Sequence, residues 1–96
     1  MRLSQKVILI TGSATGIGKA IAQRCVREGA KVIIHGLEAD LAAAVAAELG
    51  PDHAVFHVED LTHEGWPQRL VDLAVSRFGR LDAVVNNAAL VAQGNI

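Results

Sequence analysis

Three glycines, Gly12, Gly16 and Gly18, follow closely on a run of apolar residues near the start of the chain. Between a strand and a helix, glycines in this order allow a tight turn, approach of the backbone to a pyrophosphate, and close packing of the helix on the strand. The anion would lie at the helix N-terminus, where unpaired N–H groups and the positive end of the helix dipole stabilise negative charge. The spacing predicts a dinucleotide-binding turn, with a purely structural strand-to-helix turn as the alternative.

A second phosphate-binding motif, the P-loop, also ends in a Gly-Lys pair like Gly18-Lys19. That motif requires a further glycine five positions before the last one, and a hydroxyl residue after the lysine. Those two positions hold Ser13 and Ala20. The sequence therefore excludes a P-loop.

Two more stretches lie where predicted strands end: Asp60-Leu61 follows one strand, and Asn86-Asn87 ends another. Open α/β sheets bind ligands outside the carboxyl ends of their strands, so both stretches are candidates for the same site. Asp60 could instead be a solvated loop acid or a helix cap. Asn87 could instead satisfy the backbone of a turn, as asparagines commonly do.

The segments that must position these residues alternate between short β-branched runs and longer stretches of helical period. We expect buried strands over residues 6–11, 31–35, 54–58 and 81–86. The helices between them have three expected apolar faces: Ile17, Ile21 and Cys25; Leu37, Leu41, Val45 and Leu49; and Leu70, Leu73, Ala74 and Phe78. The helices are expected to end at Gly29, Gly50 and Gly79, and Thr62 is a candidate N-cap for the third.

Three strand–helix units followed by a fourth strand require right-handed crossovers and a parallel sheet with helices on its faces. The expected fold class is α/β, a Rossmann-type doubly wound parallel sheet, of which this chain supplies about four strands and three helices. In that order the first strand is central, with the second and third on one side and the fourth on the other. The fourth strand would be an apolar edge, so we expect the isolated chain to fold poorly as a monomer or to associate.

The pattern Thr11-Gly12-x-x-x-Gly16-x-Gly18 resembles that of the short-chain dehydrogenase/reductase family. Asp60-Leu61 resembles the family's acidic–apolar pair that contacts adenine. The segment 86–89 resembles its Asn-Asn-Ala-Gly stretch beside the cofactor, with Ala89 in place of glycine. The resemblance implies a cofactor site made of Gly12, Ser13, Thr15, Gly16, Ile17, Gly18, Leu37, Asp60, Leu61, Asn87, Ala88 and Ala89.

The same resemblance implies the reaction, a hydride transfer between NAD(P) and a carbonyl or alcohol substrate. A tyrosine would act as general acid and base, with a lysine four residues on and a serine polarising the carbonyl. The chain has no tyrosine, and its lysines are Lys6, Lys19 and Lys31. We therefore assign no catalytic residue, and expect residues 1–96 to be a partial NAD(P)-binding domain that stops before the catalytic segment and is inactive alone. The alternative is a non-catalytic nucleotide-binding module, which the encoding frame beyond Ile96 would distinguish.

The end of the second strand bears on the choice between NAD and NADP. NAD-binding members place an acid there, about 20 residues after the motif, to accept the ribose 2′-OH. That position holds Gly36. In the family, NADP-binding members often use a basic residue at one of two positions, which here hold Leu37 and Thr15. Glu38 is the nearby charge and would repel a 2′-phosphate, so the sequence favours NAD.

The composition excludes several classes of protein. The chain is 51% hydrophobic with a net charge of −1, too apolar for a disordered chain and without the basic excess of a nucleic-acid or anionic-membrane binder. The apolar run at residues 7–10 is too short for a secretory segment or a membrane span. Cys25 has no internal disulfide partner and is expected to be a buried, unreactive thiol. We expect a cytoplasmic protein, homo-oligomeric when complete.

Four histidines, His35, His53, His57 and His63, raise the question of a metal site. The spacing of His53 and His57 gives no helical ligand pair, and no cysteine or acid completes a tetrahedral set. We interpret all four as ordinary surface or strand-end histidines and expect no metal.

Overall fold

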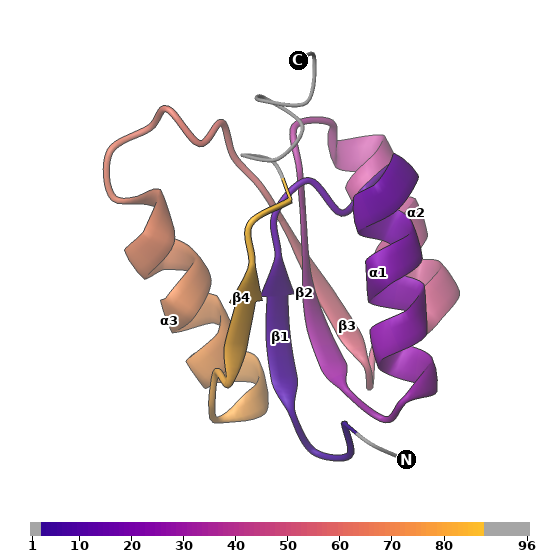
Figure 1. Cartoon of the computed structure of the whole chain (residues 1–96). Helices are drawn as coiled ribbons and strands as arrows, with labels where there is room; N and C mark the ends of the chain where they lie inside the picture. The colour runs from indigo at the N-terminus through magenta and orange to yellow at the C-terminus, as the bar shows by residue number, and fades with distance from the viewer. Residues whose placement is uncertain (1–2, 88–96) are drawn as a thin grey trace.

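The computed structural model describes residues 3–87, which form a parallel sheet with helices on both faces (Figure 1). The element order is β1 (Val7–Ile10), α1 (Gly16–Arg27), β2 (Lys31–Gly36), α2 (Ala39–Leu49), β3 (Ala54–Val58), α3 (Trp66–Phe78) and β4 (Ala83–Val85). The strand order is β3-β2-β1-β4, and every pairing is parallel. The doubly wound Rossmann-type topology expected from the sequence is therefore confirmed.

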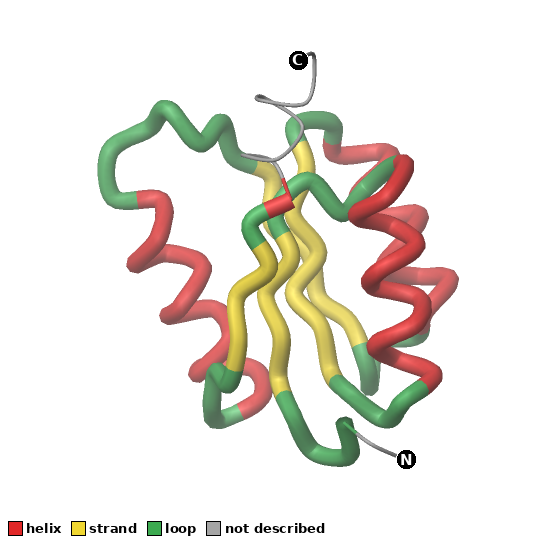
Figure 2. The backbone as a smooth tube through the Cα atoms, viewed as in Figure 1, coloured by secondary structure: helices red, strands yellow, loops and turns green. Residues whose placement is uncertain are grey.

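The sheet separates two apolar cores, because alternate residues of each strand point to opposite faces. Ile8, Ile10, Val32 and Ile34 pack under α1 and α2. Val7, Leu9, Ile33 and Val55 pack under α3 on the other face. Figure 2 shows the same arrangement, with the strands side by side and helices on both sides. Burial on both faces explains why β1 and β2 are continuously apolar rather than alternating.

The first two helices bury only part of the expected faces: Cys25 and Val45 are buried, and Ile21 and Leu49 pack against the core. α1 buries Gly18, Ala22 and Cys25, and α2 buries Ala42, Val45 and Ala46. These small residues let both helices lie close to the sheet. The expected core positions Ile17, Leu37 and Leu41 are 70%, 68% and 41% exposed, so their assignment to the core was wrong. All of them lie near the carboxyl end of the sheet, where they line a pocket instead.

The third helix begins later than a cap at Thr62 would place it. Its first residue is Trp66, its N-cap is Gly65 in the left-handed conformation, and Pro67 occupies the first turn, where no N–H is needed. The Thr62 N–H instead donates to the Asp60 side chain, at 2.8 Å. The expected end is confirmed, since Gly79 is a left-handed C-cap with φ +83°.

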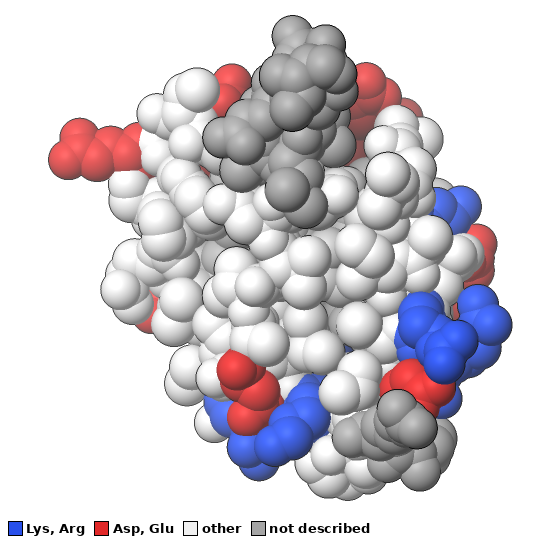
Figure 3. All heavy atoms as spheres, viewed as in Figure 1, with Lys and Arg blue, Asp and Glu red and all other residues white. Residues whose placement is uncertain are grey.

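The fourth strand is shorter than expected and forms one edge of the described sheet. It pairs only three residues with β1, from Ile8↔Ala83 to Ile10↔Val85. Before it, the Asp82 carboxylate accepts the Val7 N–H at 2.8 Å, and the Asp82 N–H donates to the Val7 carbonyl at 2.8 Å. Val84 is 55% exposed on this edge. The surface around β4 is largely uncharged in Figure 3.

None of the helices in the described part of the chain is long and apolar enough to cross a membrane.

Cys25 is buried and free, and its burial raises the pKa of the thiol. The burial and the raised pKa both agree with an inert role for this cysteine.

Candidate functional site

A pocket of about 780 Å³ lies at the carboxyl end of the sheet. The chain leaves β1 toward β2 and β3, then returns to the other side of β1 to form β4, so the strand order reverses at β1. Such a switch point is where open α/β sheets bind ligands. The lining residues are Gly12, Ala14, Thr15, Gly16, Ile17, His35, Gly36, Leu37, Glu38, Leu41, Asp60, Leu61 and Asn87.

The glycine-rich turn presents bare backbone to this pocket. Gly12 and Gly16 have φ values of +64° and +58°, a conformation that other residues rarely adopt. A Cβ added at Gly16 would meet no atom within 4 Å, so the space beside this backbone is open. The N-cap Thr15 makes no side-chain cap, and the first turn of α1 carries no acid. The start of α1 therefore fits an anion, which its N–H groups and dipole would stabilise.

Gly18 serves the packing of the turn rather than the lining of the pocket. A Cβ on this residue would lie 2.3 Å from the Gly12 carbonyl oxygen and 2.7 Å from the Asn87 amide nitrogen. The glycine thus lets α1 approach both groups. Asn87 is buried and donates from Nδ2 to the Gly12 carbonyl at 3.2 Å, so it lines the pocket and satisfies turn backbone at once.

Ser13 also faces inward and does not line the pocket. Its Oγ donates to the Ile10 carbonyl at 2.7 Å and accepts the His35 N–H at 2.9 Å. Its own N–H donates to the His35 carbonyl at 2.8 Å. These bonds fasten the turn to the end of β2.

His35 is the largest difference from the sequence-based interpretation. It is a strand-end histidine, as expected, but it is 2% exposed and lines the pocket, which the sequence did not indicate. Its Nδ1 accepts the Gly12 N–H at 2.8 Å, and its Nε2 lies 2.7 Å from the Glu59 carbonyl oxygen. Strand register could have signalled this position, since Ile10 pairs with Ile34 and the next residue of β2 then lies beside the turn.

The pocket lining also includes exposed apolar side chains and two acids. The apolar side chains are those of Ile17, Leu37 and Leu41, and the acids are Asp60 and Glu38. The Thr62 N–H donates to Asp60 Oδ1 at 2.8 Å, and this bond lowers the pKa of the carboxyl group.

Two small residues, Ala14 and Gly36, also line the pocket and are in close contact. A Cβ added at Gly36 would lie 2.8 Å from the Ala14 Cβ. An acid at the position discussed for NAD-binding members would therefore require a shift of the turn.

The segment that carries Asp60 is anchored by its neighbour Glu59. Arg69 donates from Nε to Glu59 Oε1 at 2.9 Å and from its second guanidinium nitrogen to Oε2. Arg69 also donates to the Glu64 carbonyl, at 2.9 Å. His57 Nε2 lies 2.9 Å from Oε1, and His63 Nδ1 lies 3.6 Å from Oε2. Arg69 above all, with His57, lowers the pKa of Glu59 to about 2.

Most of the sequence-predicted cofactor residues come together in this pocket. Those that line it are Gly12, Thr15, Gly16, Ile17, Leu37, Asp60, Leu61 and Asn87. Ala88 and Ala89 lie outside the described residues. Sequence reasoning considered Gly36 and Glu38 only for the choice between NAD and NADP, and did not assign Ala14, His35 or Leu41 to the site. Within residues 3–87, no group of three or more His, Cys, Asp or Glu side chains is placed to hold a metal ion.

Comparison with known proteins covers nearly the whole chain. A family model described as short chain dehydrogenase matches residues 6–96. Sorbitol dehydrogenase of Cereibacter sphaeroides is 47% identical over 90 residues, which are 94% of this chain and 35% of that protein. Momilactone A synthase of Oryza sativa subsp. japonica is 44% identical over 89 residues, 93% of this chain and 32% of that protein. The chain thus spans about a third of the length of these relatives.

Solved structures of dehydrogenases and reductases are also similar to most of this chain, which again covers about a third of each of them. A hydroxysteroid dehydrogenase from Escherichia coli superposes with a TM-score of 0.81 at 37% identity, covering 88% of this chain and 37% of that one. A 3-ketoacyl-(acyl-carrier-protein) reductase from Brucella melitensis, complexed with NADH, gives a TM-score of 0.80 at 38% identity, covering 85% of this chain and 33% of that one.

Proposed function

The chain belongs to the short-chain dehydrogenase family, and we propose that it forms the dinucleotide-binding part of an oxidoreductase acting on a carbonyl or alcohol substrate. The observation that carries this proposal is the left-handed backbone of Gly16, which lines the pocket at the start of α1 and has open space at its Cβ position. The bound nicotinamide would accept or donate the hydride. We assign no catalytic residue within the 96, which include no tyrosine.

In this proposal the pocket residues divide the cofactor between them. The turn from Gly12 to Gly16 and the start of α1 hold the pyrophosphate through backbone N–H groups. The apolar side chains of Leu37 and Leu61, with Asp60, hold the adenosine end. Asn87 borders the pocket beside Gly12 and keeps the turn in place for the nicotinamide half. Support comes from the lining of one pocket by all of these residues.

We further propose that the preferred cofactor is NAD(H) rather than NADP(H). Glu38 and Asp60 line the pocket, and among the described lining residues there is no lysine or arginine. A 2′-phosphate without a cationic partner would forgo charge-assisted hydrogen bonds worth roughly 1.5–3 kcal/mol. An NADH and NADPH competition titration should show at least tenfold tighter binding of NADH, about 1.4 kcal/mol. A tenfold preference for NADPH would contradict the assignment.

The proposal is tested by fluorescence titration of NADH against the complete protein that carries this sequence, called the parent chain below, and a matched pair of glycine variants. Gly16→Val should abolish binding, because its side chain would occupy the space needed by the pyrophosphate. Gly79→Val is the control: Gly79 also has positive φ, +83°, and open space around its Cβ, but it lies outside the pocket. Gly16→Ala and Gly79→Ala provide a milder pair if the valine variants are too unstable. Unchanged NADH affinity in the Gly16 variants would contradict the assignment of this turn to the pyrophosphate.

A further inference from the structure

The protonation of the buried His35 ring is defined by its partners. The Gly12 N–H can only donate, so Nδ1 must accept and carries no proton. The Glu59 carbonyl can only accept, so Nε2 must carry the proton. The ring is therefore neutral and in the Nε2–H tautomer. A proton on Nδ1 would instead direct one N–H at another in a site that is 2% exposed.

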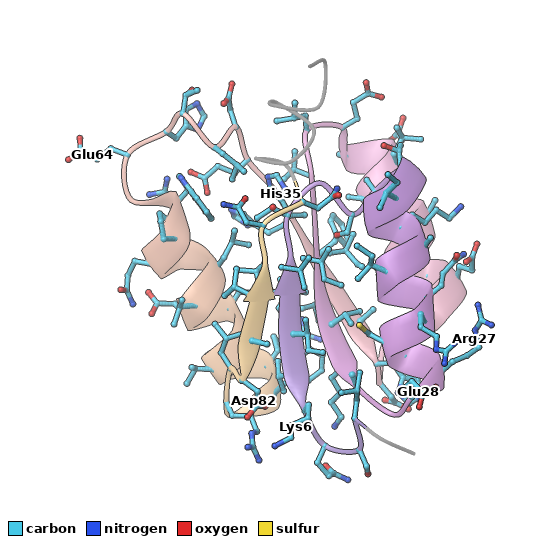
Figure 4. The ribbon with its side chains drawn as sticks, in the orientation of Figure 1. Lys6, Arg27, Glu28, His35, Glu64 and Asp82 are labelled. Carbon is cyan, nitrogen blue, oxygen red and sulfur yellow. The ribbon has the colours of Figure 1, made fainter. Side chains whose placement is uncertain are left out.

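This ring connects two parts of the pocket that are far apart in the sequence. Figure 4 shows His35 at the carboxyl end of the strands, between the turn after β1 and the segment after β3. Its Nδ1 holds the peptide that precedes Gly12, while Asn87 holds the carbonyl of the peptide that follows. Its Nε2 holds the carbonyl of Glu59, the residue directly before Asp60.

The position of the ring is itself fixed by backbone contacts. The His35 N–H and carbonyl both bond to Ser13, at 2.9 and 2.8 Å, and Ser13 Oγ bonds to Ile10. The Glu59 carboxylate is directed to Arg69, so the contact with His35 uses only its carbonyl. The link between the turn and the Asp60 segment is thus built from neutral hydrogen bonds, one part-buried and one buried.

We propose that His35, as the neutral Nε2–H tautomer, is a positioning residue that sets the pyrophosphate turn and the Asp60 segment at the spacing that one dinucleotide requires. This proposal rests on the proposed function in one respect, that the ligand is a dinucleotide contacting both segments. His35 positions the two segments and takes no part in the reaction. Its two ring nitrogens determine where Gly12 and Asp60 lie relative to one another.

Three substitutions separate this role from simple filling of space. His35→Phe keeps a ring of similar size and loses both hydrogen bonds. His35→Asn retains an acceptor near the Nδ1 position, and His35→Gln extends an amide donor toward the Nε2 position. The Phe variant should weaken NADH binding about tenfold or more, and the Asn and Gln variants should each recover part of that loss. His53→Asn, an exposed position outside the pocket, should bind NADH like the parent chain.

Nuclear magnetic resonance of the unliganded chain gives an independent test. The ¹⁵N shifts of the His35 ring should identify Nε2 as the protonated nitrogen. The Gly12 amide should exchange slowly with solvent, faster in the Phe variant and slowly again in the Asn variant. A protonated Nδ1, or a Phe variant that binds NADH as tightly as the parent chain, would overturn the proposal. If the parent chain binds no NADH, the proposed function fails, whereas tautomer and exchange still decide whether the His35 bridge exists.

Discussion

The glycine-rich turn at residues 11–16 and the segment at residues 59–65 both line the pocket, yet they are anchored in different ways. Neutral hydrogen bonds made by Ser13, His35 and Asn87, buried or part-buried, hold the turn. The second segment is held mainly by charge, through Glu59 and Arg69. In the proposed function the turn accepts the pyrophosphate, and anchors without charge suit this role because a fixed carboxylate there would repel the phosphates. The segment proposed for the adenosine end has no such restriction.

The comparison predicts that the turn is the less tolerant of the two to added volume. Gly18→Ala would force a methyl group against the Gly12 carbonyl and the Asn87 amide, at 2.3 and 2.7 Å before relaxation. Overpacking of this kind costs about 1–3 kcal/mol, and we expect a loss of folding free energy in that range together with weaker NADH binding. Urea unfolding measures the first and titration the second. Lys19→Ala, the neighbouring and half-exposed position of α1, is the control and should leave both nearly unchanged.

If Gly18→Ala were as stable as the parent chain and bound NADH normally, the close contact of α1 with the turn would not be a requirement of the site. The turn at residues 11–16 would then be no less tolerant of added volume than the segment at residues 59–65.

The second segment should instead be the part that acid disrupts. The folded-state pKa of Glu59 is about 2, below its ordinary 4.5. A pKa lower in the folded than in the unfolded chain contributes stability that is complete above pH 4.5 and is lost as the pH falls toward 2. Glu59→Gln removes this contribution, so the stability of that variant should fall less between about pH 6 and about pH 3 than that of the parent chain.

Urea unfolding at both pH values checks this prediction. Glu64→Gln is the matched control, because Glu64 lies in the same segment and its side chain points away from the molecule in Figure 4. It should retain the parent chain's dependence on acid. Equal acid sensitivity in Glu59→Gln and the parent chain would mean that the Glu59–Arg69 pair does not stabilise the segment at residues 59–65.

Much of the fold could be predicted from the sequence because its signals are local. Buried strands such as Val7–Ile10 are continuously apolar, and Gly29, Gly50 and Gly79 all have positive φ at the ends of their helices. The turn motif and the polar residues after β3 and β4 could be predicted for the same reason. They are short patterns whose place in a strand–helix unit is fixed by topology.

The missed features depend on geometry that no short pattern records. At the start of α1 the buried residue is Gly18 rather than Ile17, a step of about 100° around the helix, whereas Cys25 is buried as expected. A leucine at the start of α2 fits a core stripe and a ligand pocket equally well by pattern alone. The roles of His35 and Glu59 depend on partners that are 23 and 10 residues away in sequence.

An amide chemical-shift map of the ¹⁵N-labelled chain on addition of NADH tests the assignment of this pocket most directly. We expect shifts concentrated at the carboxyl end of the sheet, at the pocket residues Gly12, Gly16, Leu37, Asp60, Leu61 and Asn87. Residues at the opposite end, such as Gly29 and Asp82, should be unaffected. Shifts centred on that opposite end, or none at saturating NADH, would contradict the assignment of this pocket to a dinucleotide.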